Sequence, residues 1–344
     1  MLPPAGPGAD AAVVLDGVAK HFGPVQALRG LDARIHFGRL TGLVGPDGAG
    51  KTTLMRIMAG LLVPNAGRVT LAGFDTVLDN DAIHAASGYM PQRFGLYEDL
   101  SVMENLRLYA RLRSLDADRH GALFDELLAF TRLGPFTARL AGKLSGGMKQ
   151  KLGLACALMA RPRVLLLDEP SVGVDPVSRK DLWRMVQALT DEGMAVVWST
   201  AYLDEAERCD SVLLLEQGRL VFDGPPDQLT GRLQGRSLRL EEVGAERRAL
   251  LSEALDLASV GDGVIQGAGV RVVLREGADG GEVQALADRV GAHLAQVPAR
   301  FEDAFIDLLG GGPGGTSALA QRLPPVTLDT EVAVSCHEIG RAHV

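Results

Sequence analysis

Gly45-Pro-Asp-Gly-Ala-Gly-Lys-Thr-Thr53 is the stretch that decides the fold of this chain. It matches the pattern G-x-x-x-x-G-K-[ST] and stands between an apolar run, Leu40–Val44, and a helical pattern, Thr52–Leu61. Glycines let a backbone wrap around phosphates, and the N-terminus of the following helix favours negative charge. We therefore expect Lys51 to reach the β- and γ-phosphates of a nucleotide and Thr52 to bind Mg²⁺. The expected phosphate-binding loop consists of Gly45, Pro46, Asp47, Gly48, Ala49, Gly50, Lys51, Thr52 and Thr53.

A second motif, Val164-Leu-Leu-Leu-Asp-Glu-Pro170, ends an apolar run in two carboxylates. The run is apolar at every position, as in a parallel strand that is buried on both faces. We expect Asp168 to lie near Mg²⁺ and Glu169 to polarise an attacking water. Short apolar runs alternate with helical patterns from Val13 to about Leu229, which indicates an α/β fold.

The third motif, Leu144-Ser-Gly-Gly-Met-Lys-Gln150, opens a helical pattern that runs to about Ala160. Ser145 can cap this helix, while Gly146 and Gly147 can present N–H groups to a phosphate. A cap alone needs only the serine. This string, between a phosphate loop and an Asp-Glu strand, resembles the signature of the ABC ATPases, and the resemblance covers roughly residues 13–230.

The resemblance implies a P-loop NTPase domain of the ABC type, with ATP and Mg²⁺ as cofactors. It implies that the signature of one domain faces the γ-phosphate held by the phosphate loop of a second domain. The signature residues expected to bind ATP are Ser145, Gly146, Gly147 and Gln150. Phe22 matches the position of the ring that stacks on adenine, although a core Phe is the alternative. Gln92 matches the glutamine that contacts Mg²⁺ and water and senses the γ-phosphate.

Two further segments have counterparts in the family. Gly95–Asn105 resembles the surface that meets a membrane subunit. Ser171–Asp175 resembles the loop that crosses the interface between two nucleotide-binding domains. The chain therefore has the expected motifs of a transporter ATPase in the expected order.

The domain organisation can be predicted along the whole chain. Residues 1–11 are expected to be disordered, and 12–230 to form the ABC-type domain with an inserted helical subdomain at about 93–150. A small α+β domain is expected at 236–309; it resembles the C-terminal extension of drug- and polysaccharide-export ATPases, with a role in dimer contact, in regulation or only in stability. Residues 310–330 form a Gly/Pro-rich linker. Residues 331–344 are interpreted as the start of a truncated second ATPase domain, with Glu331–Ser335 as its opening strand, followed by an artefactual tail. One back-translation of Glu338–Val344 matches the start of a common sequencing adapter; the alternative is an ordinary polar C-terminus.

Composition restricts the partners. The net charge is −8, so no global positive field attracts nucleic acid. The longest apolar runs, such as Val164–Leu167, fall far short of the roughly 20 residues that cross a bilayer. Three cysteines without metal-type spacing favour a reducing cytoplasm. We therefore expect a cytoplasmic protein, peripheral on the cytoplasmic face of the cell membrane, that serves a membrane through a partner.

The predicted function is to bind and hydrolyse ATP and to energise export through a separate ABC permease, of drugs or other hydrophobic compounds. The second nucleotide-binding domain is expected in the same chain if the sequence is truncated, and otherwise in a homodimer. The motifs are most like the first half of tandem-domain ATPase subunits of multidrug-type exporters. The alternative is an ABC ATPase that acts on ribosomes. ABC proteins that act on DNA fit less well, because no Cys-x-x-Cys and no long coiled-coil insertion is present.

One motif departs from the family pattern and generates a prediction. In Ser199-Thr-Ala-Tyr-Leu-Asp-Glu-Ala-Glu207, Ala201 occupies the place of a histidine that reaches the γ-phosphate. A methyl group cannot donate a hydrogen bond. Loss of one such contact typically costs on the order of 10²–10³ in rate, so this site is expected to bind ATP well and hydrolyse it slowly. Ala201→His should raise the measured ATPase rate, and an unchanged rate would count against this interpretation.

Overall fold

The computed structural model describes residues 11–92, 95–115, 120–243 and 247–309. The expectations for residues 1–10, for the linker at 310–330 and for 331–344 lie outside these ranges. Ala11, the last residue of the segment expected to be disordered, is buried. None of the helices in the described part of the chain has the length and apolarity that a bilayer crossing needs.

The central sheet orders its strands β10-β9-β3-β8-β7-β6. All neighbouring strands pair in parallel except β10, which is antiparallel to β9. The strands are β3 (Leu40–Val44), β6 (Ser87–Met90), β7 (Val164–Asp168), β8 (Ala195–Thr200), β9 (Ser211–Glu216) and β10 (Arg219–Gly224). Because the carboxyl ends of parallel strands meet at one edge, the loops after β3, β7 and β8 are brought together there.

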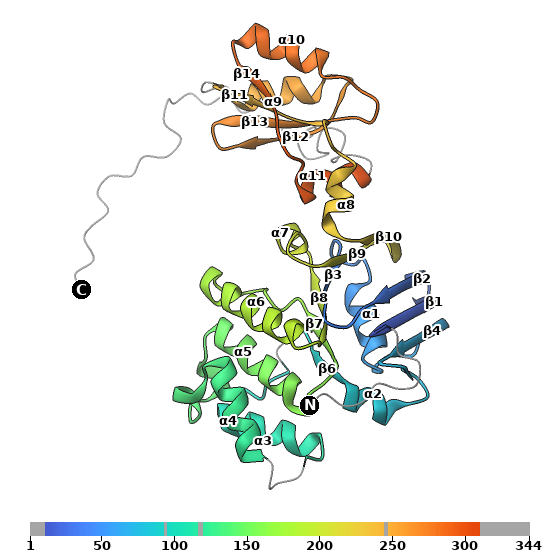
Figure 1. Ribbon diagram of the computed structural model, residues 1–344, viewed down its shortest axis with the longest axis vertical. Helices are drawn as coiled ribbons and strands as arrows, with labels where there is room; N and C mark the ends of the chain where they lie inside the picture. Colours follow the sequence, from blue (N-terminus) through green and yellow to red (C-terminus); the bar gives the residue numbers. More distant parts are fainter. Residues whose placement is uncertain (1–10, 93–94, 116–119, 244–246, 310–344) are drawn as a thin grey trace, which may run out of the picture.

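Both faces of the central sheet are covered, which explains the unbroken apolar runs. In β7, Leu165 and Leu167 belong to one apolar cluster, while Val164 and Leu166 belong to another. The first cluster is shared with helices α3 (Val102–Leu112), α4 (His120–Thr131), α5 (Gly146–Ala157) and α6 (Pro176–Asp191). The second is shared with α1 (Lys51–Met58), α2 (Asn80–Ala86) and an antiparallel sheet of strands β1 (Val13–Phe22), β2 (Val25–Ile35), β4 (Ala66–Leu71) and β5 (Phe74–Asp75). Figure 1 shows these two layers on opposite sides of β7 and β8.

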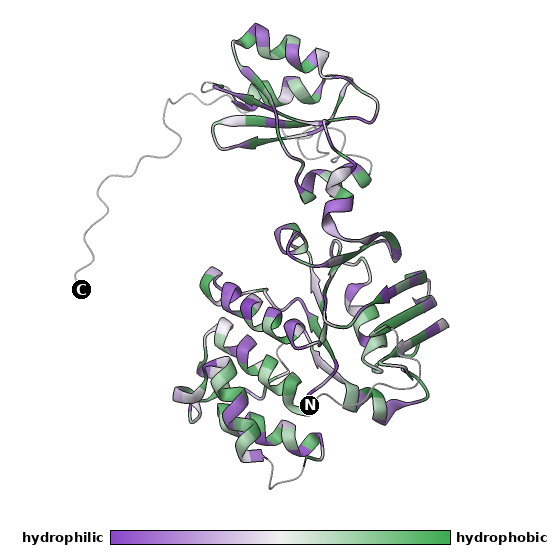
Figure 2. Cartoon of the chain, viewed as in Figure 1, coloured by the Kyte–Doolittle hydropathy of each residue, from purple (hydrophilic) through white to green (hydrophobic). Residues whose placement is uncertain are grey.

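A third, antiparallel sheet lies beyond β9 and β10, with strand order β12-β13-β11-β14 (Figure 1). Its elements are β11 (Ser237–Glu241), α9 (Arg247–Leu255), β12 (Val260–Gln266), β13 (Gly269–Leu274), α10 (Gly281–Val290) and β14 (His293–Gln296). Hydrophobic and hydrophilic residues are interspersed along these elements, as Figure 2 shows. The closing helix α11 (Phe301–Leu308) contacts β12 of this sheet and also packs on α8 (Pro226–Gly231) and α7 (Leu203–Ala206). Phe301 is fully buried in the same apolar cluster as α5 and α6.

Three details differ from the sequence-based expectations. The helix after the phosphate loop ends at Met58 rather than Leu61, because the chain turns at Gly60 with φ +71°. Leu112 continues the helical spacing of Val102 and Leu106 but is 65% exposed, since α3 ends there. Strand β12 was not predicted, because Gly261, Asp262 and Gly263 interrupt its apolar pattern.

Candidate functional site

The phosphate loop connects β3 to α1 and is held in a conformation that requires glycine. Gly50 precedes α1 with φ +109°, and a Cβ there would lie 2.6 Å from the carbonyl oxygen of Ala27. Lys51, only 4% exposed, donates hydrogen bonds to the carbonyl oxygens of Gly45 (2.8 Å) and Pro46 (3.1 Å). The loop therefore holds a nearly buried ammonium group at the carboxyl end of β3.

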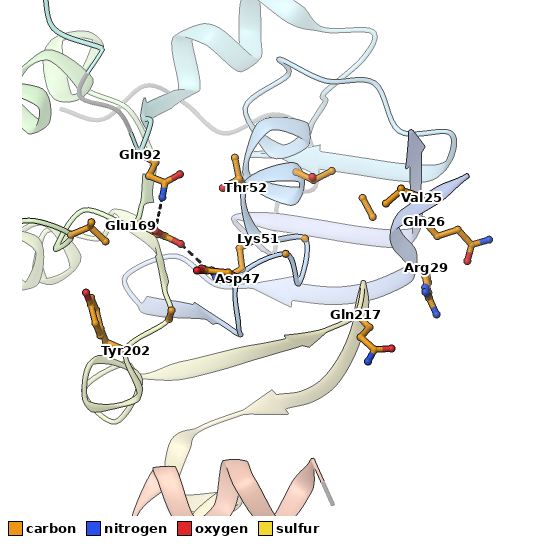
Figure 3. Close-up of a pocket in the computed structure, with 16 residues that line it drawn as sticks. Val25, Gln26, Arg29, Asp47, Lys51, Thr52, Gln92, Glu169, Tyr202 and Gln217 are labelled. Carbon is orange, nitrogen blue, oxygen red and sulfur yellow. Dashed lines mark hydrogen bonds and ion pairs between the residues drawn. The ribbon is translucent and has the colours of Figure 1, made fainter. Parts of the chain in front are cut away.

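The two predicted carboxylates follow β7 and lie beside this loop. Glu169 Oε1 is 3.5 Å from Lys51 Nζ, and its Oε2 accepts a hydrogen bond of 2.7 Å from Gln92 Nε2. Figure 3 shows Lys51 and Gln92 approaching Glu169 from two sides. Glu169 adopts φ +50°, a left-handed conformation that costs a non-glycine residue of order 1–3 kcal/mol. Its N–H donates to the carbonyl of Ser199 at the end of β8, which helps to hold this conformation.

Asp168 accepts hydrogen bonds from side chains on two other elements. The Thr52 hydroxyl donates to Oδ1 at 3.2 Å, and the Tyr89 hydroxyl donates to Oδ2 at 3.4 Å. Burial, and then the charge of Asp168, raise the pKa of Tyr89 to about 12, so this phenol stays protonated at neutral pH. Sequence reasoning missed Tyr89; its only signal is its place in the strand that pairs with β7.

The expected magnesium ligands form an oxygen-rich group. Thr52 and Asp168 contribute adjacent oxygens, and the amide oxygen of Gln92 is left available because its nitrogen binds Glu169. Hard oxygen donors with room for phosphate and water ligands are what Mg²⁺ prefers. Among the described residues, no cluster of three or more His, Cys, Asp or Glu side chains could hold a metal on its own. The set thus fits a cation that arrives together with phosphate oxygens.

A pocket of about 990 Å³ opens over these groups (Figure 3). It adds side chains that sequence reasoning did not single out, among them Gln26 and Arg29 of β2, Gln217 and Tyr202. Ala201, at the position expected for the missing histidine, also lines it. The full lining is Val25, Gln26, Ala27, Arg29, Asp47, Gly48, Gly50, Lys51, Thr52, Thr53, Gln92, Glu169, Val172, Ala201, Tyr202 and Gln217.

Phe22 pairs across β1 and β2 with Val25, which lines the pocket, but Phe22 itself is not among the lining residues. Its side chain is 50% exposed, and Lys20 Nζ lies 5.3 Å from its ring centroid. The alternative of a core phenylalanine is therefore wrong. Stacking on adenine stays a prediction.

The signature lies outside this pocket. Ser145 caps α5, accepting a hydrogen bond of 3.3 Å from the Met148 N–H. Gly146 and Gly147 pack closely on neighbouring segments, and Gln150 is buried. None of Ser145, Gly146, Gly147 and Gln150 lines the pocket over Lys51. One chain therefore does not bring its own signature to its own phosphate loop.

The sequence is similar to those of known proteins. A family model described as ABC transporter matches residues 28–172. The Daunorubicin resistance ATP-binding protein DrrA3 of Streptomyces coeruleorubidus is 40% identical over 228 residues, which cover 66% of this chain and 72% of that protein. The Nod factor export ATP-binding protein I of Rhizobium etli is 32% identical over 308 residues, 87% of this chain and 93% of that protein.

The chain belongs to the ABC transporter family of ATP-binding proteins. Within this ABC family, a solved ATP-binding subunit of an ABC transporter matches with a TM-score of 0.59 and 27% identity, over 65% of this chain and 93% of that chain. A dimeric ATP-binding cassette bound to ADP and Pi matches with a TM-score of 0.57 and 26% identity, over 62% and 98%. These likenesses confirm the predicted fold.

A longer relative is more similar in sequence. The Probable multidrug ABC transporter ATP-binding protein YbhF of Escherichia coli (strain K12) is 53% identical over 319 residues, 92% of this chain. The chain spans only 55% of the length of that ABC protein.

The close packing of the ABC signature yields a prediction about stability. A Cβ added at Gly147 would lie 2.3 Å from the Cβ of Ser178, at the start of α6. Gly147→Ala should therefore lower the free energy of unfolding by about 1–3 kcal/mol through overpacking, as measured by urea denaturation. Adding Ser178→Gly removes the clashing atom and should recover part of this loss.

The matched control is Gly121→Ala on α4, where an added Cβ meets no atom within 4 Å. It should leave stability unchanged or raise it by up to about 1 kcal/mol, because alanine favours helix. Equal effects of Gly147→Ala and Gly121→Ala would show that close packing does not constrain the signature.

Proposed function

We propose that this chain binds and hydrolyses MgATP and thereby energises export through a separate ABC permease, with drugs or other hydrophobic compounds as cargo. The observation that carries the proposal is the convergence of Lys51, Glu169 and Gln92 in one pocket, with Asp168 and Thr52 beside them. The class of cargo is inferred from relatives named for multidrug transport and daunorubicin resistance.

Binding follows from the charge of the loop. The Lys51 ammonium already lies beside two carbonyl oxygens and a carboxylate, so a terminal phosphate is a further anionic partner in the same place. The N-terminus of α1 adds its partial positive charge. Mg²⁺ bound with the phosphates would neutralise part of their charge, and Thr52, Asp168 and Gln92 are the residues that would hold it.

We assign ATP hydrolysis to Glu169, which lies beside Lys51, and to its partner Gln92. The Glu169 carboxylate is the general base that would orient and polarise water, and Gln92 fixes it through a hydrogen bond of 2.7 Å. Ala201 supplies no polar group to the γ-phosphate, so we infer that turnover at this site is slow.

The signature is proposed to complete a second nucleotide site. Ser145 is exposed at the N-terminus of α5. The N–H groups at this helix end can bind a phosphate group of a nucleotide that is held by another domain. The facing phosphate loop would come from another copy or from a further domain of a longer protein. Ser171–Asp175 is proposed to cross that interface; within it Val172 is exposed, and Asp175 caps α6.

Segment 95–105 is proposed as the contact with the permease, at the cytoplasmic face of the membrane. The Asn105 side chain is fully buried and shapes the segment, accepting from the Tyr97 N–H and donating to the carbonyls of Tyr97, Leu100 and Ser101. The Tyr97 side chain is 54% exposed. Glu98 forms an ion pair of 2.7 Å with Lys149 of α5, which ties the segment to the signature helix.

The test is to co-express a tagged chain with the membrane proteins encoded beside its gene and to purify it in mild detergent. An apolar, multi-span protein should be retained, and Tyr97→Ala should reduce its amount several-fold, because an exposed aromatic ring is a typical interface anchor. Leu61→Ala is the matched control, since Leu61 is also 54% exposed but lies outside the segment. Retention of ribosomes instead of a membrane protein, or equal retention by both variants, would contradict the proposal.

A further inference from the structure

A buried carboxylate, that of Glu205, joins the loop that follows Glu169 to the end of β8. Glu205, on α7, is 1% exposed, and its Oε2 accepts three hydrogen bonds. The donors are the Ser171 hydroxyl (3.0 Å), the Trp198 Nε1–H (3.0 Å) and the Thr200 hydroxyl (2.6 Å). Ser171 begins the loop after Glu169, while Trp198 and Thr200 end β8. One oxygen atom therefore joins two separate segments of the site.

The hydrogen bonds around Glu205 extend to residues that line the pocket. The Thr200 hydroxyl oxygen also accepts a hydrogen bond of 3.0 Å from the N–H of Tyr202, which lines the pocket together with Ala201. The neighbouring Ser199 carbonyl accepts from the Glu169 N–H. Movement of the carboxylate would therefore shift both the loop that carries Ala201 and the backbone that holds Glu169 in its strained conformation.

The second oxygen of Glu205 faces α6. Oε1 lies 3.8 Å from Nε of Arg179, and neither atom has a hydrogen-bond partner among the described residues. Arg179 in turn lies over the Tyr202 ring, 5.2 Å from its centroid. The carboxylate thus has opposite charge on one side and three neutral donors on the other, which no neutral side chain of the same size reproduces.

The short helix α7 packs against α11, the helix that closes the unit of the third sheet. Glu207 Oε1 accepts a hydrogen bond of 2.8 Å from the N–H of Phe301, the first residue of α11. Figure 1 shows α7 between the end of β8 and α11, in agreement with the contacts between these elements. The short helix that carries Glu205 is therefore held between β8 and α11.

We propose that Glu205 is a positioning residue for ATP hydrolysis, which holds the loops Ser171–Asp175 and Ala201–Tyr202 in register with Glu169. This inference rests on the proposed function. It predicts that Glu205 affects the chemical step and not ATP binding, because Lys51 and the phosphate loop make no contact with it in the hydrogen bonds and ion pairs described.

The test is a single-turnover measurement of ATP cleavage at saturating MgATP, with ATP affinity measured separately by titration. In Glu205→Gln the amide NH₂ group must face either the three donors or Arg179. The variant therefore loses either hydrogen bonds from the three donors or the charge attraction to Arg179. The rate should fall at least about tenfold while the affinity for ATP stays within about twofold. Thr200→Val keeps the volume but removes the hydroxyl that connects Glu205 with Tyr202, and its rate should fall at least about threefold.

Asp75→Asn is the matched control. Asp75 is also buried and paired with an arginine, Arg68, but it belongs to β5 at the edge of the antiparallel sheet. It should lower the melting temperature without changing the cleavage rate. The inference is overturned if Glu205→Gln and Thr200→Val cleave ATP at the wild-type rate, or if their affinity for ATP falls in parallel with the rate. Failure of the wild-type chain to bind ATP would instead overturn the proposed function, and this inference with it.

Discussion

The structure depends on one buried cation, the Lys51 ammonium, which lies between the carbonyls of its own loop and the carboxylate of Glu169. Placing it there requires two parallel strands, β3 and β7, whose carboxyl ends reach the same edge of the sheet. It also requires glycine at positions where a side chain would strike the backbone of β2 or β9. Much of the remaining fold can be understood as support for this edge, with apolar clusters on both faces of the sheet.

The sequence alone predicted the parts of the site that are encoded locally. Lys51, Thr52, Asp168 and Glu169 could be identified because each stands at a fixed offset from a strand and a turn. Tyr89 could not be identified in this way. Its contact with Asp168 depends on which strand pairs with β7, and the local sequence of either strand does not reveal that pairing.

The third sheet shows the same limit at the level of packing. Several of its helices and strands could be predicted from periodicity, yet β12 was missed because of its glycines. Periodicity also gave no sign that α11 packs on α7 as well as on its own sheet, or that Phe301 joins the core of the main domain. The hydrogen bond between Phe301 and Glu207 joins residues 94 positions apart, and α11 thereby packs on α7, the short helix that follows the loop with Ala201.

The most direct measurement of the central claim is the affinity of the chain for MgATP, by isothermal titration, in the wild type and in Lys51→Ala. The account predicts a clear binding isotherm for the wild type and an affinity lower by about two orders of magnitude in the variant, because a buried charge-assisted contact to phosphate is lost. Lys180→Ala, at an exposed lysine of α6, serves as the control and should bind like the wild type. Equal affinities in Lys51→Ala and the wild type, or no binding by the wild type, would contradict the account.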